Sequence, residues 1–339
     1  MKDKLVSALL SLLVSIATVS CVYEAGFDPE EDLLPSDHVF LNLRVNVAQT
    51  RLSPLSRQVV DDLNYFEAPV SEYEYINTLR VIIVRTSADG LKADSIEHNR
   101  KFVSAVKGSL EYDNMTFKVK GGENKRVYLI ANEDFVCANT GYDFNKLAAG
   151  SPYPAGELES ITLTRQKDSP LIDNRTGGTY VPMSECFSLS VPKPADPGDR
   201  YIFKDMFITR AAVKFSFIFR MADGTGEIPG MSVGGIRVDG LADSEYLMPR
   251  ATVYDPAKHL PADTPLGGRF ITDYEIPAAA AHTEFAFTDK VELKQLPDSA
   301  FYHPLVYLPE SRKGKYTVTI KVGDSEDEAG YFEPVTLPN

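Results

Sequence analysis

Residues 38–47 read HVFLNLRVNV, and this stretch decides the class of fold that the chain adopts. Apolar and polar side chains alternate along it, which is typical of a β-strand with one buried face. Asn42, Arg44 and Asn46 fall on the polar face. The apolar face consists of Val39, Leu41, Leu43, Val45 and Val47. This face must pack against a second layer, which residues further along the chain have to supply.

The residues that precede this strand indicate export. Lys2 and Lys4 come before an uncharged run of apolar and small residues at positions 5–19. This order is typical of a signal peptide, and a run of about fifteen residues is short for a membrane span. We therefore expect the chain to leave the cytoplasm.

The apolar run ends at Ser20-Cys21, where a small residue stands directly before a cysteine. Lipoprotein signal peptidase requires such a pair, because the cysteine thiol is acylated before cleavage. We expect residues 1–21 to be a lipoprotein signal peptide ending at the lipobox, with lipidation at Cys21. Residues 22–37 are acidic and predict a solvated tether. The alternative is an ordinary signal peptide with a cysteine near the cut site.

Beyond the first strand, the sequence predicts further strands and long connections. Residues 48–75 are rich in polar, acidic and proline residues and predict an exposed connection. Residues 76–84 read INTLRVIIV, as expected for a central strand covered on both faces. Gly121-Gly122 separates two further apolar runs, residues 115–120 and 126–131, which predicts a hairpin.

The rest of the chain predicts few helices and many short strands. Residues 143–149 and 157–163 predict two short helices packed on the sheet edge. The breaker cluster PKPADPGD at residues 192–199 predicts a boundary between an N-terminal domain, 38–195, and a C-terminal domain, 196–339. Strands of the second half are expected at residues 201–220, 232–238, 252–254, 270–274, 284–287, 300–308 and 316–322. Short strands at this spacing predict an all-β chain of two tandem β-sandwich domains with a few short helices.

Composition restricts the partners. The formal net charge of −13 disfavours binding to nucleic acid or to anionic lipid surfaces, so we expect no nucleic-acid partner. Besides Cys21, the chain has only Cys137 and Cys186. These two cysteines allow one disulfide in an oxidising compartment, but two separate buried thiols are the expectation.

No pattern in the sequence indicates catalysis, a metal or a cofactor. The glycines of residues 224–230 lack the spacing of a dinucleotide-binding loop and predict a turn. The carboxylates of residues 324–328 lack the alternation of a calcium loop and predict a solvated hairpin tip. The five histidines are scattered, and no serine stands in a nucleophile-elbow context. We expect no enzyme activity, no metal and no cofactor.

Four short segments carry a resemblance to a known family. They are Tyr128-Leu-Ile-Ala-Asn132, Val181-Pro-Met-Ser184, Thr209-Arg-Ala-Ala-Val-Lys214 and Tyr307-Leu-Pro-Glu-Ser311. Together with the signal ending at Cys21 and the strand at 38–47, their order resembles the fimbrillin superfamily. Members of this family are lipoprotein precursors of type V pili. The resemblance implies two transthyretin-like, Greek-key sandwiches and a role as a structural subunit of a fimbria that supports cell adhesion.

The resemblance also implies how subunits would join. In stalk subunits of the family, an arginine-specific protease cuts behind the first strand, and a strand from the next subunit fills the groove left behind. Here the strand to be lost is 38–47, and Arg51 and Arg57 are equal candidates for the cut. The implied partners are other fimbrial subunits and, before processing, the outer membrane through the lipid on the cell surface. Anchor subunits of the family keep their lipid, so stalk, anchor and tip roles stay open.

Other roles stay open. Pro334 and Pro338 suit an edge strand or a terminus better than a donor strand. A surface lipoprotein that binds glycan or peptide ligands would share the signal, the acidity and the strands, and exposed aromatic residues would distinguish it. A secreted hydrolase on a β scaffold is a third candidate.

Overall fold

The computed structural model of the chain describes its strand-rich parts. The described residues are 37–47, 72–86, 93–104, 108–109, 111–166, 169–172, 178–219, 233–249, 251–254, 271–274, 276–277, 282–287, 294–295, 301–309, 315–322, 330–331 and 335–338. They are mostly strands, which confirms the predicted all-β class. No described helix is long and apolar enough to cross a bilayer.

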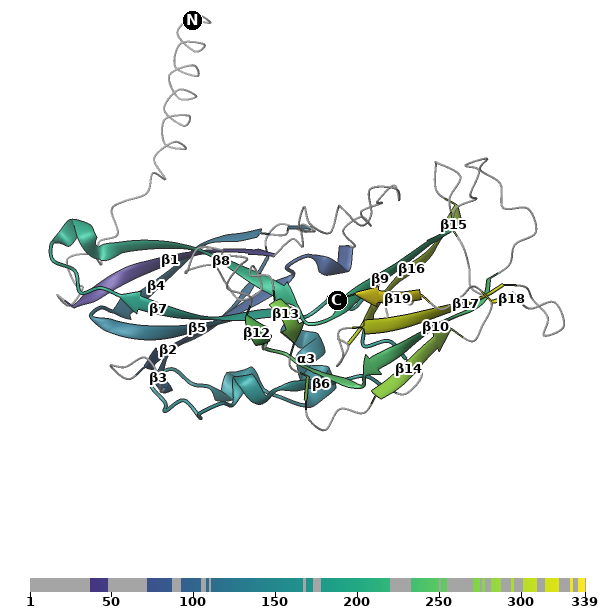
Figure 1. The fold of residues 1–339 in the computed structure, drawn as a ribbon. Helices are drawn as coiled ribbons and strands as arrows, with labels where there is room; N and C mark the ends of the chain where they lie inside the picture. The colour runs from purple at the N-terminus through teal and green to yellow at the C-terminus, as the bar shows by residue number, and fades with distance from the viewer. Residues whose placement is uncertain are drawn as a thin grey trace, which may run out of the picture.

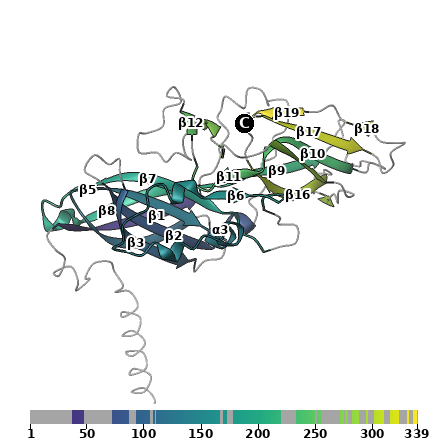
Figure 2. The same ribbon diagram turned by 90° about the horizontal axis from the view of Figure 1, so that it is seen from below.

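The largest element is a seven-stranded sheet in the order β3-β2-β5-β7-β8-β1-β4, at one end of the molecule (Figures 1 and 2). Its strands are β1 (His38–Val47), β2 (Thr78–Thr86), β3 (Ala93–Val103), β4 (Glu111–Lys120), β5 (Glu123–Ala131), β7 (Met183–Val191) and β8 (Tyr201–Arg210). Strands β7 and β8 are joined at one end only, through Met183–Arg210 and Ser184–Thr209. The sheet therefore folds into two layers, β8-β1-β4 and β3-β2-β5-β7, whose apolar side chains share one core.

The two strands that the sequence predicted most clearly are both present. β1 spans the expected residues and buries the expected face. β2 is buried on both faces along almost its whole length. One face contacts the core between the layers, and the other contacts a second core that includes Tyr128 and Leu158. The expectation of a strand covered on both faces is confirmed.

The predicted hairpin around Gly121-Gly122 is wrong. β4 pairs with β1, and β5 pairs with β2 and β7, so the turn connects the two layers. Gly121 N donates to Asp37 O at 2.7 Å, and Gly122 N donates to Val191 O at 2.8 Å. A side chain at Gly121 would start 2.7 Å from Pro192 O, so glycine is required there. Strands far away in the sequence take the places that the hairpin partners would have had.

The short helices differ from the prediction. Only the 3-10 turns η3 (Phe144–Lys146) and η4 (Leu158–Ser160) form within the two predicted segments. The end of the second segment enters strand β6 (Thr162–Thr164) instead. The one α-helix of the described residues, α3 (Glu133–Thr140), was not predicted. Its apolar periodicity is weak, because Val136 is its only buried apolar residue.

The second half of the chain forms smaller sheets, the two largest of which lie at the other end of the molecule (Figure 1). One sheet contains β14 (His282–Phe287), β10 (Val233–Ala242), β17 (Lys315–Val322), β18 (Gly330–Tyr331) and β19 (Val335–Pro338). A second contains β15 (Lys294–Gln295), β16 (Phe301–Leu308) and β9 (Val213–Phe219), and a third pairs β12 (Ala251–Tyr254) with β13 (Ile271–Tyr274). The last pairs β11 (Ser244–Tyr246) with β6, which precedes β7 in the chain.

The proline cluster at residues 192–199 does not separate the two ends of the molecule. It connects β7 to β8 through the 3-10 turn η5 (Pro197–Arg200), and β8 returns to the seven-stranded sheet. The chain leaves this sheet only after Arg210, where Ala211 and Ala212 are buried in the core that also contains Tyr307. Prolines break a strand but do not determine which sheet the next strand joins, so the boundary expected at 195/196 is misplaced.

Candidate functional site

The slot that holds β1 is the first candidate site. β1 lies between two strands, because it pairs with β4 in antiparallel and with β8 in parallel orientation. The five inward side chains named above are each 0–4% exposed. Opposite them lie apolar residues of β2 and β5, among them Val81 and Leu129. Without β1, the slot would expose this core and the unpaired backbone groups of both neighbouring strands.

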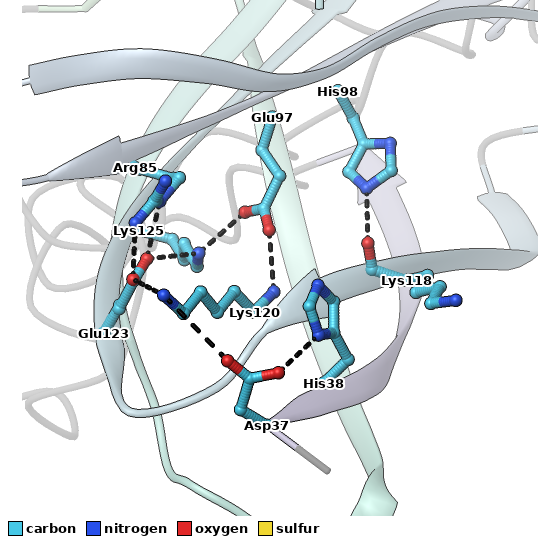
Figure 3. A network of polar contacts seen from close by, with 9 residues as sticks. All are labelled: Asp37, His38, Arg85, Glu97, His98, Lys118, Lys120, Glu123 and Lys125. Carbon is cyan, nitrogen blue, oxygen red and sulfur yellow. Dashed lines mark hydrogen bonds and ion pairs between the residues drawn. The ribbon is translucent and has the colours of Figure 1, made fainter. Parts of the chain in front are cut away.

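Polar groups gather where β1 begins (Figure 3). Asp37 accepts a hydrogen bond from His38 Nδ1 at 2.8 Å and lies 3.9 Å from Lys120 Nζ. Lys120 Nζ also lies 3.4 Å from Glu123. The hydrogen bond from His38 lowers the pKa of Asp37. Burial opposes this effect, and the charges of His38 and Lys120 add to it. This network ties the first residue before β1 to the turn between β4 and β5.

A buried lysine stands at the centre of the network. Lys125 is fully buried, and its Nζ lies 2.7 Å from Glu97 and 3.1 Å from Glu123. Arg85 donates two hydrogen bonds to Glu123, at 2.6 and 2.7 Å. The hydrogen bonds from Arg85 hold the pKa of Glu123 at about 2, although burial opposes them. Two carboxylates and two cations therefore balance each other beside the start of β1.

The same region closes the gap between the two edge strands, β3 and β4. Glu97 of β3 accepts a hydrogen bond from Lys120 N at 2.7 Å, and His98 Nε2 donates to Lys118 O at 2.7 Å. Phe102 and Phe117 meet edge to face, with ring centroids 5.9 Å apart. Side chains thus join β3 to β4 without a backbone ladder. β4 is held on this side independently of β1.

Two of the four segments that carry the family resemblance meet in a second place, on Glu74 of the 3-10 turn η2 (Glu72–Glu74). Glu74 is 1% exposed. Its carboxylate lies 2.8 Å from each of Arg210 Nη2, Lys214 Nζ and Tyr307 Oη. Burial alone would raise the pKa of Glu74, but Arg210, Lys214 and Tyr307 outweigh it and lower the pKa. Glu74 therefore connects the segment before β2 to both ends of the molecule.

Two more segment residues act as connectors. Asn132, in the left-handed region at φ 58°, accepts hydrogen bonds from Asn77 N and Thr78 N through Oδ1. Its Nδ2 donates to Tyr75 O and Val181 O, so the amide is fully used. Ser184 Oγ donates to Leu247 O, which belongs to the second half of the chain. The resembling segments are therefore structural connectors.

Glu74 was missed from the sequence, although a signal was present. The segments contain Arg210 and Lys214 four residues apart, and two partly buried cations need an acceptor. The acidic stretch before β2 is where that acceptor lies. Nothing in the sequence shows which acidic residue of the stretch is buried.

Several predicted site residues lie outside the described part of the chain. They are Cys21, Arg51 and Arg57, together with residues 224–230 and 324–328 of the discarded loop motifs. Cys137 and Cys186 are free thiols, as expected, but both are half-buried where full burial was predicted. Burial, together with the charge of Glu159, raises the pKa of Cys186 to about 12, so this thiol is a poor nucleophile.

The described residues contain no group of three or more metal-binding side chains. A recess of about 510 Å³ lies beside the end of α3. In it, Glu157 accepts hydrogen bonds from Tyr142 Oη at 2.9 Å and Lys146 Nζ at 2.6 Å. These polar groups satisfy each other, so the recess offers a ligand little unused hydrogen-bonding capacity.

Comparisons with known proteins give likenesses of structure only. No protein-family model matches the chain, and no curated protein matches it. A fimbrial assembly protein from Parabacteroides distasonis is similar in structure, with TM-score 0.40 and 12% identity, over 89% of this chain and 85% of the other. The tip fimbrial protein Mfa3 from Porphyromonas gingivalis is similar with TM-score 0.45 and 11% identity, over 88% of this chain and 81% of the other. These values are low, so what the neighbours do is not transferred to this chain.

Proposed function

We propose that the protein is a structural subunit of a fimbria, and that β1 is a strand that a neighbouring subunit's strand can replace. The observation that carries the proposal is the position of β1. It is the central strand of its layer, and its five inward side chains fill one wall of the core. The segment with Arg51 and Arg57 follows four residues or more after it. The order and content of the resembling segments support the same role.

The energetics of the slot make exchange a reasonable way to join subunits. Fully burying one Val or Leu side chain stabilises a fold by about 1.5–3 kcal/mol, so five of them contribute roughly 7–15 kcal/mol. The whole stability of a domain is about 5–15 kcal/mol. An empty slot would therefore be unstable, and a strand from another subunit would restore both the core and the two ladders.

In this proposal the lipid at Cys21 delivers the chain to the outer membrane. If Arg51 or Arg57 is cut, the lipid leaves with β1 and the subunit belongs to the stalk. If neither is cut, the lipid anchors the subunit. The protein is proposed to act through assembly and adhesion, not as an enzyme.

The test treats the purified full chain with an arginine-specific protease. We expect a cut at Arg51 or Arg57, found by N-terminal sequencing, and a ladder of polymers on a gel run without boiling. Arg51→Ala, Arg57→Ala and the double variant identify the site, and Arg44→Ala in β1 is the matched control. Cleavage that yields only soluble monomers lacking β1 would overturn the stalk form, and a chain that resists cleavage at both arginines would favour the anchor form.

A ligand-binding surface lipoprotein is the second candidate function. Its distinguishing feature was an exposed row of aromatic residues, and β8 carries one: Tyr201, Phe203 and Phe207 are among the exposed large apolar residues. Their position on the edge of a layer gives this row a different explanation.

A further inference from the structure

The outer edge of β8 combines an exposed aromatic row with backbone groups that have no strand beside them. On one side, β8 pairs with β1 along Tyr201–Ile208. On the other side, within the described residues, it pairs with β7 only through Thr209 and Arg210. Beyond that point the two strands diverge, so the stretch from Phe203 to Ile208 forms a free sheet edge.

The direction of the backbone groups follows from the one place where β7 and β8 meet. Ala211 N donates to Pro182 O at 2.9 Å, so the backbone of residue 211 points to the β7 side. Backbone and side-chain directions both repeat every two residues along a strand. The N–H and C=O groups of Phe203, Asp205 and Phe207 therefore point to the free edge, while those of the residues between them point to β1.

The side chains of the same three residues point outward. Exposure alternates along β8, with Phe203, Asp205 and Phe207 exposed and Met206 and Ile208 buried. Phe203 is 75% exposed, the largest value among the exposed large apolar side chains of the described residues. Tyr201 extends the row and stacks on Phe40 of β1, with ring centroids 5.3 Å apart. Three consecutive outward positions thus offer aromatic, acidic and aromatic contacts beside free hydrogen-bonding groups.

The core beneath this edge is also incompletely covered. Ile202 of β8 and Phe187 and Leu189 of β7 pack on the core but are only half-buried. A strand added beside β8 would cover part of these side chains. An extended polypeptide would therefore gain backbone hydrogen bonds, aromatic contacts and burial at the same place.

Charge indicates which polypeptide fits. Two copies of this chain could pair β8 with β8 in the antiparallel register that uses all three outward residues. In that register Asp205 would lie directly opposite Asp205 of the other copy. Like charges directly opposite each other on paired strands are destabilising. The net charge of −13 adds to this repulsion. The guanidinium of Arg44, which lies beside Asp205 in register, is paired with Glu111. A partner with a basic residue opposite Asp205 fits better.

We propose that the free edge of β8 binds an extended segment of another protein, with Lys or Arg opposite Asp205 and apolar residues opposite Phe203 and Phe207. This contact is separate from the exchange of β1, because it uses the chain with β1 in place. It gives the subunit a second way to bind a polypeptide, without cleavage.

The test uses the uncleaved chain and the peptide acetyl-Thr-Val-Thr-Lys-Thr-Val-Thr-amide. Binding is followed by fluorescence anisotropy of a labelled copy and by amide hydrogen exchange. We expect saturable binding that protects the amides of Phe203, Asp205 and Phe207 and leaves β1 protected. N-methylation of the two valines and the lysine, whose N–H groups face β8, should weaken binding at least tenfold. N-methylation of the two threonines that flank the lysine should change binding less than twofold.

Variants of the chain complete the test. Phe203→Ser with Phe207→Ser should weaken binding at least fivefold, and both positions are exposed enough to leave the fold intact. Asp205→Lys should weaken binding of the lysine peptide and strengthen binding of the same peptide with glutamate in place of lysine. Equal binding of both N-methylated peptides, or binding unchanged by the phenylalanine substitutions, would overturn the proposal. So would binding of a soluble glucan oligosaccharide at Phe203 and Phe207 without binding of the peptide. None of these results depends on exchange of β1, so the proposed function stands or falls separately.

Discussion

β1 and β2 are both apolar strands inside the same seven-stranded sheet, but they are held in different ways. β1 buries one face completely, whereas its other face is partly exposed, with Asn42 half-buried and Arg44 in solvent. β2 buries both faces and carries Arg80, which is almost fully buried and bonds to Glu133, Asn99 and Asn145. This difference is the reason for proposing β1, and not β2, as the strand that another subunit's strand replaces.

The buried ion pair of β2 gives the largest expected effect. Glu133→Ala would leave the buried Arg80 without its carboxylate partner, and only two amide oxygens would remain as acceptors. We therefore expect the free energy of unfolding to fall by about 3–5 kcal/mol. Urea denaturation at neutral pH measures it. The matched control is Asp134→Ala, the next residue, whose side chain is 75% exposed and pairs with Lys101. That change should cost less than about 1 kcal/mol. Equal losses would mean that β2 is not fixed by this pair.

The second largest effect is expected from a cavity in the core under β1. Leu41→Ala should lower the free energy of unfolding by about 2–5 kcal/mol, because the leucine is fully buried between the layers. After cleavage behind β1, the same change should also speed the release of the strand, measured by size-exclusion chromatography of the cleaved chain. Arg44→Ala, on the exposed face of β1, should do neither by a comparable amount. If Leu41→Ala destabilises the intact chain but leaves release unchanged, β1 is not a separable strand.

The smallest expected effect is a pH dependence at the start of β1. Glu123 has a pKa of about 2, below the ordinary value of 4.5. A depressed pKa contributes stability that is fully present above the unfolded value and lost as the pH falls through the folded value. Between pH 4.5 and 2 we therefore expect the amides of β1 to lose hydrogen-exchange protection before those of β2. Glu123→Gln should flatten this decline, and Glu111→Gln should not.

The sequence predicted strands whose buried side chains are apolar, and it missed a strand whose fixed contacts are made by polar side chains. β1 and β2 follow from side-chain periodicity. β3 was not predicted, because its fixed contacts are made by Glu97, His98 and Asn99, which an alternation of apolar residues does not reveal. The β4–β5 turn was misread as a hairpin, since a local rule for glycine turns cannot detect that β1 pairs with β4.

The candidate sites were likewise predictable only where they depend on a local pattern of apolar residues. The burial of the five inward residues of β1 was predicted correctly, because it follows from period two. The free edge of β8 could not be predicted, since it depends on where β7 and β8 diverge. The role of Glu74 depends on three residues more than a hundred positions away in the sequence. Contacts of that range follow from the fold and not from any local pattern.

The central claim is that β1 can be replaced, and strand exchange observed by native mass spectrometry tests it most directly. The chain cleaved behind β1 would be mixed with an isotope-labelled peptide HVFLNLRVNV and, in parallel, with the β2 peptide TLRVIIVRT. We expect a one-to-one complex in which the labelled β1 peptide replaces the original strand, and no complex with the β2 peptide. A cleaved chain that keeps its own strand without exchange, or that takes up both peptides equally, would contradict it.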